Sequence, residues 1–210
     1  DVILRQVADA WCDPLELRGD SLLGGPGLLQ AARGGHVTLA NALGSGLLEN
    51  PGLAAFLPLL CRQLLGEDLK LPSLATWWCG DPDDRGYVLA NLERLVVHSI
   101  LPNQPHWDGS RLDAATRAHL VDCIQAAPHL YVGQETLPLS TAPVLEDGQL
   151  TPRPVMLRGF TVADGDGYRV MPGGLARVSS GLDTLQAAVQ QGGISKDWWV
   201  LAPTPQKHVT

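Results

Sequence analysis

The sequence predicts an α+β fold in which mixed sheets are packed with helices. Three segments with apolar residues at helical spacing, near 51–65, 82–94 and 113–127, occupy the first two-thirds of the chain. Short β-like stretches separate them, and the chain becomes rich in strands after about residue 129. Helices and strands therefore mix without the strict alternation that a doubly wound parallel sheet requires.

The length of 210 residues suits one large domain or two closely associated subdomains. We place a division between residues 94 and 95, which gives subdomains 1–94 and 95–210. The chain begins in an apolar stretch without an initiator Met, so we expect further sequence upstream.

The composition excludes several classes of protein. The net charge is −7 and the basic residues form no cluster, which argues against a non-specific nucleic-acid surface. Apolar runs fall far short of the roughly 20 residues that span a membrane. The four cysteines lack CxxC spacing, which argues against a disulfide framework or zinc site. We therefore expect a cytoplasmic protein without nucleic-acid or membrane partners.

The first half of the chain has clear boundary signals. A short helix is expected at 28–33 and a short strand at 37–40. Asn50 is placed to cap the next helix, with Pro51 at its first position and Gly66 at its end.

The second half starts with a helix that begins at Asp81-Pro82 and continues into a β-like stretch at 95–100. A further helix at 113–127 ends before a proline. The remaining elements are expected to be a strand at 129–136, a hairpin of 155–162 and 168–171 across the turn 164–167, a strand at 175–178, a helix at 183–191 and a strand at 198–201.

Two N-terminal features have both a binding and a structural interpretation. Clustered carboxylates can bind Mg²⁺, but turn and cap chemistry is the favoured explanation for them. The Gly-Ser-Gly turn at 44–46 could present backbone N–H groups to a phosphate, although a structural turn is favoured there too. The carboxylates concerned are Asp9, Asp13, Glu16 and Asp20.

Two arginines in the β-rich part are candidates for an anion clamp. Strand alternation places Arg158 on one face with Met156, Phe160 and Val162, where a guanidinium needs an anion or carbonyl groups. Arg177 follows a Pro-Gly-Gly turn. Together they suit a phosphate or carboxylate clamp, and structural salt bridges are an equal alternative.

His98 interrupts an apolar run, and we interpret it as a buried or edge histidine. Spacing gives it no metal-ligand or catalytic-triad partners.

Several blocks of the sequence resemble circularly permuted ATP-grasp proteins, the relatives of glutathionylspermidine synthase. They are DPLELRGDSLLGGPGLLQAARGGHVTLANALGSGLLE, FLPLLCRQLLGEDLKLPSLATWWCG, YVGQETLPLSTAPV, LRGFTV, RVMPGGLARVSS and SKDWWVL. They extend over nearly the whole chain, in order. The resemblance suggests the C-terminal portion of a bacterial protein, of a family whose long forms carry an additional α-helical region.

The resemblance implies a partial ATP-grasp region that holds ATP and Mg²⁺ between two α+β subdomains. In such proteins a carboxylate takes the γ-phosphate to form an acyl-phosphate, and an amine displaces it. It implies that Gln134 and Glu135 contact adenine and that Arg158, Arg177 and Lys196 act in catalysis, with Arg158 and Lys196 also binding the nucleotide. Its metal-side candidates are Asp9, Asp13 and Asn41.

Two departures from the family pattern keep a second hypothesis open. The usual RRVDD block reads Arg5-Gln6-Val7-Ala8-Asp9 here, and His98 stands on the strand that usually supplies a Lys or Arg to the phosphates. The first hypothesis is an ATP- and Mg²⁺-dependent carboxylate–amine ligase with a peptide-like or other small substrate. The alternative is a catalytically degenerate module for nucleotide binding or protein interaction, with a protein partner or the upstream half of the chain. A third is a fragment that binds nothing alone.

Overall fold

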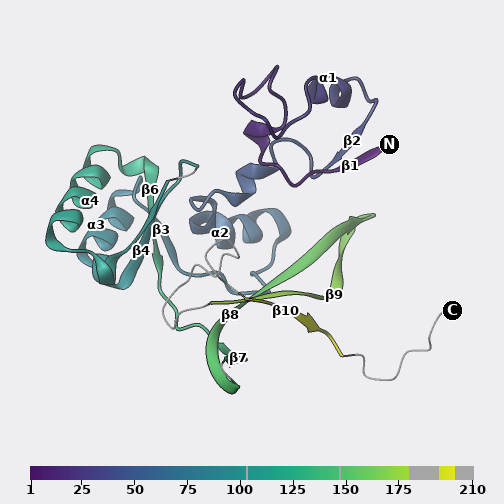
Figure 1. Ribbon diagram of the computed structural model, residues 1–210. Helices are drawn as coiled ribbons and strands as arrows, with labels where there is room; N and C mark the ends of the chain where they lie inside the picture. Colours follow the sequence, from purple (N-terminus) through teal and green to yellow (C-terminus); the bar gives the residue numbers. More distant parts are fainter. Residues whose placement is uncertain (103, 147, 180–193, 202–210) are drawn as a thin grey trace. The chain divides into compact units, whose positions relative to one another are not determined.

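The computed structural model describes residues 1–102, 104–146, 148–179 and 194–201 (Figure 1). The chain forms two compact units, Asp1–Thr136 and Leu137–Thr210. The division expected at 94/95 falls instead at 136/137, because strands on either side of residue 94 pair in one sheet. The mixed α+β architecture predicted from the sequence is confirmed. Within the described residues, no helix combines the length and apolar character needed to cross a lipid bilayer.

The first part of unit 1 contains little regular structure. The parallel strands β1 (Val2–Leu4) and β2 (Thr38–Ala40) pair with each other, and the helix α1 (Leu28–Arg33) precedes β2. Single 3-10 turns lie at Asp9–Trp11 and Ser45–Glu49. The predicted helix at 28–33 and strand near 37–40 are both confirmed.

The second part of unit 1 is a four-stranded antiparallel sheet covered by helices. The sheet order is β3-β6-β4-β5, so β6 and β4 are the inner strands. The elements in chain order are α2 (Leu53–Leu65), β3 (Thr76–Trp78), α3 (Pro82–Ala90), β4 (Leu95–Ser99), β5 (His106–Asp108), α4 (Ala114–Ala126) and β6 (Tyr131–Glu135).

The helix boundaries follow their capping signals. Asp81 accepts hydrogen bonds from the backbone of Asp83 and Asp84 at the start of α3, and Asp113 caps α4 in the same way. Helix α2 differs slightly from the expectation. Its N-cap is Gly52, because the Asn50 side chain accepts from the Gly52 N–H and closes a turn before the helix begins.

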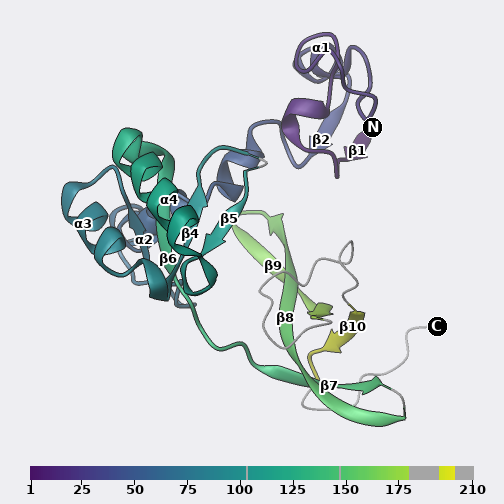
Figure 2. The same cartoon turned by 60° about the vertical axis from the view of Figure 1, so that its left-hand side comes forward.

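Helices α3 and α4 lie beside each other on one face of the sheet (Figures 1 and 2). The core on that face consists of Cys79, Val88, Leu92, Leu95, Val97, Leu120 and Ile124. Residues on the strands alternate between faces, so Trp78 and Val132 point to the opposite face. There Trp78 contacts Phe56 of α2, with ring centroids 5.8 Å apart.

Unit 2 is a four-stranded antiparallel sheet in the order β10-β9-β8-β7. Its strands are β7 (Thr141–Glu146), β8 (Gln149–Asp164), β9 (Gly167–Val178) and β10 (Ile194–Trp199). The predicted hairpin across 164–167 is confirmed, with Gly165 at a φ of 58° in the turn. The strands expected at 168–171 and 175–178 are one continuous strand, β9. The helix expected at 183–191 lies outside the described residues.

Candidate functional site

The two candidate arginines lie on the same face of the unit 2 sheet. Arg158 on β8 pairs with Leu175 on β9, and Arg177 on β9 pairs with Met156 on β8. Paired residues of antiparallel strands project to one face, and so do residues two apart on a strand. The arginines are therefore diagonal neighbours, with Cα atoms roughly 7–8 Å apart. Asp197 of β10, opposite Leu175, projects to this face as well.

The surroundings of the two guanidinium groups differ. Arg158 is exposed, whereas Arg177 is partly buried. The buried Nε of Arg177 has no hydrogen-bond partner among the residues that the structure describes. A buried donor without a partner costs about 1–3 kcal/mol, so this nitrogen is a place where an added acceptor would stabilise the protein.

The wider apolar face expected around Arg158 stays a prediction. The β8–β9 pairing shifts register between Gly159 and Thr161, where one residue of β8 lies opposite three residues of β9. The extra residues are therefore on β9 and not on the strand of Arg158. Sequence periodicity cannot reveal such a shift.

Lys196 lies on the other face of the sheet. It pairs with Ala176 of β9, the neighbour of Arg177, and neighbouring residues on a strand point to opposite faces. Its Nζ donates a hydrogen bond to the Pro143 carbonyl of β7. The same face carries the small buried core of the unit, which includes Val144 and Val178. The structure thus brings Arg158 and Arg177 together and separates Lys196 from them.

Gln134 and Glu135 are the last two residues of the inner strand β6, and their side chains form hydrogen bonds to residues at the start of the edge strand β3. The Gln134 Nε2 donates to Thr76 Oγ1 at 3.1 Å, and the Glu135 Oε1 accepts from the Ala75 N–H at 2.8 Å. They point to opposite faces of the sheet. These two hydrogen bonds use Gln134 Nε2 and Glu135 Oε1, and a base on one face of the sheet would meet only one of the two side chains.

Asp9 is occupied by a structural network around Arg5. The Arg5 guanidinium lies 2.7 Å from Asp9 Oδ1 and donates to the carbonyls of Asn41 and Ala42 at 3.2 and 3.1 Å. Asp9 Oδ2 accepts from the Gly44 and Gly46 N–H groups at 3.2 and 2.9 Å. These are the N–H groups considered for phosphate binding. Because they already donate to Asp9, the hydrogen bonds agree with the interpretation of residues 44–46 as a structural turn. The four-residue spacing of Arg5 and Asp9 is the sequence signal that could have identified this pair.

Asp13 is fully buried, and its carboxylate accepts three backbone N–H groups. The donors are Leu15 at 2.9 Å, Gly27 at 3.2 Å and Leu29 at 3.0 Å. The Leu29 N–H in particular lowers the pKa of Asp13 from its usual range against the opposing effect of burial, and the Leu15 and Gly27 N–H groups lower this pKa further. Asp13 thus joins two loop segments to the start of α1.

The metal-side candidates as they stand do not fit a magnesium site. The carboxylates of Asp9 and Asp13 already have protein partners, and the main-chain carbonyl of Asn41 accepts from Arg5. The part of the chain that the structure describes contains no group of three or more His, Cys, Asp or Glu side chains that could hold a metal ion. Metal binding by these three residues stays a prediction that requires the existing contacts to break.

His98 occupies β4 beside His106 of β5, with the two rings stacked 5.8 Å apart. Burial lowers the pKa of His98 below the ordinary value of a histidine, and the neighbouring His106 lowers this pKa further. The imidazole is therefore neutral at pH 7 and supplies no fixed positive charge there.

The chain thus combines an α+β architecture with two neighbouring arginines on one face of an antiparallel sheet. The family model for circularly permuted ATP-grasp type 2 matches residues 1–179, and the chain belongs to this family.

The chain is also similar to several curated bacterial proteins. It is 41% identical over 211 residues to the uncharacterized protein Rv2567 of Mycobacterium tuberculosis, covering 99% of this chain and 23% of that protein. It is 37% identical over 205 residues to Rv2411c of the same organism, covering 97% and 37%. It is 38% identical over 210 residues to sll0335 of Synechocystis, covering 98% and 43%. The chain thus spans less than half the length of these relatives.

Proposed function

We propose that the chain contributes to an ATP- and Mg²⁺-dependent ligase that joins a carboxylate to an amine through an acyl-phosphate. The substrate class that we propose is peptide-like. ATP would supply the phosphoryl group that activates the carboxylate. In such a reaction the protein acts mainly by positioning the reactants and neutralising charge.

The observation that carries the proposal is the pairing of Arg158 and Arg177 on one sheet face. Two guanidinium groups separated by roughly 7–8 Å at the backbone can reach the same phosphate chain or carboxylate. Among the described residues the Nε of Arg177 has no hydrogen-bond partner, and this supports a role for an added anion at Arg177. We assign both arginines to the transferred phosphoryl group or the substrate carboxylate.

The other predicted contacts follow from the family resemblance. Gln134 and Glu135 would contact the adenine at the end of β6. Lys196 would bind the nucleotide on the opposite sheet face from the arginines, after releasing the Pro143 carbonyl. Because Asp9 and Asp13 are occupied, we derive no step through a protein-bound metal.

The test is a calorimetric titration of MgATP into the chain and into its Arg158→Ala and Arg177→Ala variants, with ADP release measured in parallel. Arg169→Ala is the matched control. Arg169 lies on β9, as Arg177 does, but it forms an ion pair with Asp164 at the tip of the hairpin. Losing a hydrogen bond to a charged group costs about 1.5–3 kcal/mol, so each site variant should bind about 10- to 100-fold more weakly. The titration is repeated with a full-length protein that contains this chain, and absence of binding by the full-length protein at millimolar MgATP refutes the proposal.

His98 is the observation that favours the second candidate, a module without catalysis. A neutral, half-buried imidazole stands where the resemblance places a cation for the phosphates. A degenerate module of this kind would bind MgATP, or a protein partner, without releasing ADP. The combination of MgATP binding in the titration and no ADP release with any carboxylate–amine pair would favour it over the ligase.

A further inference from the structure

His98 and His106 lie directly opposite each other on neighbouring strands of the unit 1 sheet. The β4–β5 pairing aligns them as partners, and their ring centroids are 5.8 Å apart with the ring planes inclined by 29°. Side chains of directly opposed residues start from Cβ atoms roughly 4.5–5.5 Å apart. The two imidazoles can therefore reach one small ligand between them. Strand register creates this pair, so the sequence spacing gave no indication of it.

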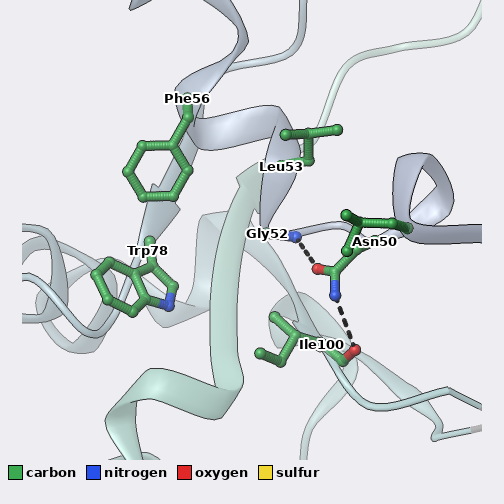
Figure 3. Close-up of a pocket in the computed structure, with 7 residues that line it drawn as sticks. Asn50, Gly52, Leu53, Phe56, Trp78 and Ile100 are labelled. Carbon is green, nitrogen blue, oxygen red and sulfur yellow. Dashed lines mark hydrogen bonds between the residues drawn. The ribbon is translucent and has the colours of Figure 1, made fainter. Parts of the chain in front are cut away.

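The two histidines lie at the solvent-accessible end of one face of their sheet. Cross-strand partners project to the same face, and the row that begins at Trp78 passes Val132 and ends with the two histidines. Helix α2 covers the Trp78 end, where Phe56 packs on the indole (Figure 3). At the other end β5 is an edge strand, His106 is exposed and His98 is half-buried. A ligand from solution thus has access to the histidine end.

The separation of the two rings suits a metal ion held by both. A zinc–nitrogen bond of about 2.0–2.1 Å places the metal roughly 3.2 Å from the centre of an imidazole. At that distance from two centroids 5.8 Å apart, the lines from the ion to the centroids enclose about 130°. Moving the rings together by about 0.6 Å gives the tetrahedral angle of about 109°. The broad χ2 torsion of histidine allows both rings to aim a nitrogen at the ion.

The carboxylate on this part of the face already has protein partners, so water would complete the coordination. Asp108 projects to the same face, two residues from His106. Its Oδ1 accepts from the Ser110 N–H at 3.1 Å and from Ser110 Oγ at 2.7 Å, and its Oδ2 lies 3.3 Å from Arg111 Nε. The described residues provide no third His, Cys, Asp or Glu ligand for the site. Exchangeable positions on the metal therefore remain, in contrast to a closed structural zinc site.

The donor atoms select the class of metal. Neutral imidazole suits Zn²⁺, Ni²⁺ and Cu²⁺, whereas Mg²⁺ prefers oxygen ligands. Because burial and the neighbouring His106 lower the pKa of His98, its imidazole is in the neutral, ligating form at pH 7. The pair is therefore ready to bind a transition metal without first releasing a proton from His98.

We propose that His98 and His106 form a binding site for a divalent transition metal ion such as Zn²⁺, with water in the remaining coordination positions. A rival pair in the described part of the chain is His119 and Cys123 on α4, whose Nε2 and Sγ atoms are 3.6 Å apart. That pair lies on one turn of a helix and supplies a thiol, which binds a metal as the thiolate. The two sites thus differ in ligand chemistry, and an experiment can distinguish them.

The first test is a calorimetric titration of Zn²⁺ and of Ni²⁺ into the chain at pH 7, without a polyhistidine tag and with the cysteines reduced. His98→Gln and His106→Gln should each weaken binding at least about tenfold, because a lone imidazole lacks the second, already positioned ligand. His36→Gln is the matched control, since His36 is exposed and lies outside the pair. Cys123→Ser should leave the affinity unchanged, and millimolar Mg²⁺ should not compete.

Co²⁺ absorption and thermal unfolding give two further measurements. A thiolate ligand gives bound Co²⁺ a near-ultraviolet charge-transfer band that imidazole ligands do not give, so the proposed site should lack this band. Zn²⁺ at about 100 times its dissociation constant should raise the melting temperature of the unmodified chain by several degrees, because it binds the folded state. The same addition should leave both histidine variants unchanged. Far-UV circular dichroism confirms that the variants are folded.

Three results overturn the proposal. They are no binding of either metal up to about 1 mM, an affinity that neither histidine variant reduces, and an affinity that falls with Cys123→Ser instead. The MgATP titration depends on Arg158 and Arg177 in unit 2, so the failure of one experiment leaves the other proposal standing.

Discussion

Replacing Gly133 with alanine should show how tightly β6 is held against α3. A Cβ added at Gly133 would lie 2.7 Å from Val88 Cγ2, 3.1 Å from Val88 Cγ1 and 3.2 Å from Leu95 Cδ1. Val88 is fully buried on α3, and a β-branched side chain in a helix has one strongly preferred rotamer. The valine cannot turn away, so the helix and sheet must separate by several tenths of an ångström.

Overpacking of this kind costs about 1–3 kcal/mol in a well-packed core. Alanine also has a small advantage over glycine in a strand, so we expect Gly133→Ala to reduce the free energy of unfolding by about 1–2 kcal/mol. Val88→Ala alone should cost about 2 kcal/mol through the cavity it leaves. In the double variant the new methyl group occupies part of that cavity. The double variant should therefore be at least about 1 kcal/mol more stable than the two separate losses predict.

The assay is urea unfolding of the four proteins followed by far-UV circular dichroism, since the described α-helices all lie in unit 1. The double-mutant cycle isolates the contact between the two positions. Strict additivity of the two substitutions, or an unchanged stability of Gly133→Ala, would show that β6 and α3 are not packed at this distance. Gly133 precedes Gln134 and Glu135 on β6, the residues proposed to contact adenine.

Two further predictions concern pH. Folding lowers the pKa of His98, so as the pH falls the imidazole is protonated in the unfolded chain before it is protonated in the folded chain. The free energy of unfolding is therefore not reduced by His98 above the unfolded pKa near 6.5, and it decreases as the pH falls from there toward the folded pKa. In the His98→Gln variant the melting temperature should fall less between pH 7 and pH 5 than it does in the unmodified chain. The pKa of Asp13 is also lowered on folding, so its contribution is complete above the unfolded value of 3.8 and disappears as the pH falls through the folded value. Asp13→Asn should lower the melting temperature by several degrees at pH 7 and by less at pH 3. The control Asp20→Asn, at an exposed site, should change the melting temperature little. Equal effects of Asp13→Asn at both pH values would contradict the role of the Asp13 carboxylate.

The elements that could be predicted from the sequence are those whose signals are local. The Asp81-Pro82 step contains both the cap and the first residue of α3, and the Asp-Gly-Asp-Gly turn contains the geometry of the β8–β9 hairpin. Gly66 ends α2 in a left-handed conformation, as its position indicated. Each signal depends on residues within one turn of the chain, and such residues interact whatever the tertiary structure.

The candidate site could be predicted only in part, because its arrangement depends on register. The sequence indicated that Arg158 and Arg177 belong together, and strand pairing puts them on one face. It did not indicate that Lys196 lies on the opposite face, since a shift of one residue in the β9–β10 pairing would reverse this. Nor could it show that Asp9 caps a turn 35 to 37 residues away. Contacts of that separation depend on the whole fold.

The distribution of satisfied polar groups favours unit 2 for the proposed anion contacts. In residues 1–136 the polar candidates bond to the protein itself: Asp9 to Arg5 and a turn, Asp13 to three backbone N–H groups, and Glu135 to Ala75. Among the described residues, two buried side-chain atoms lack a hydrogen-bond partner, Asp9 Oδ1 and Arg177 Nε. Asp9 Oδ1 is compensated by its ion pair with Arg5 at 2.7 Å. An acceptor that reached Arg177 Nε would gain a hydrogen bond there, so we infer that the first contacts to phosphate or carboxylate are made by the arginines of unit 2.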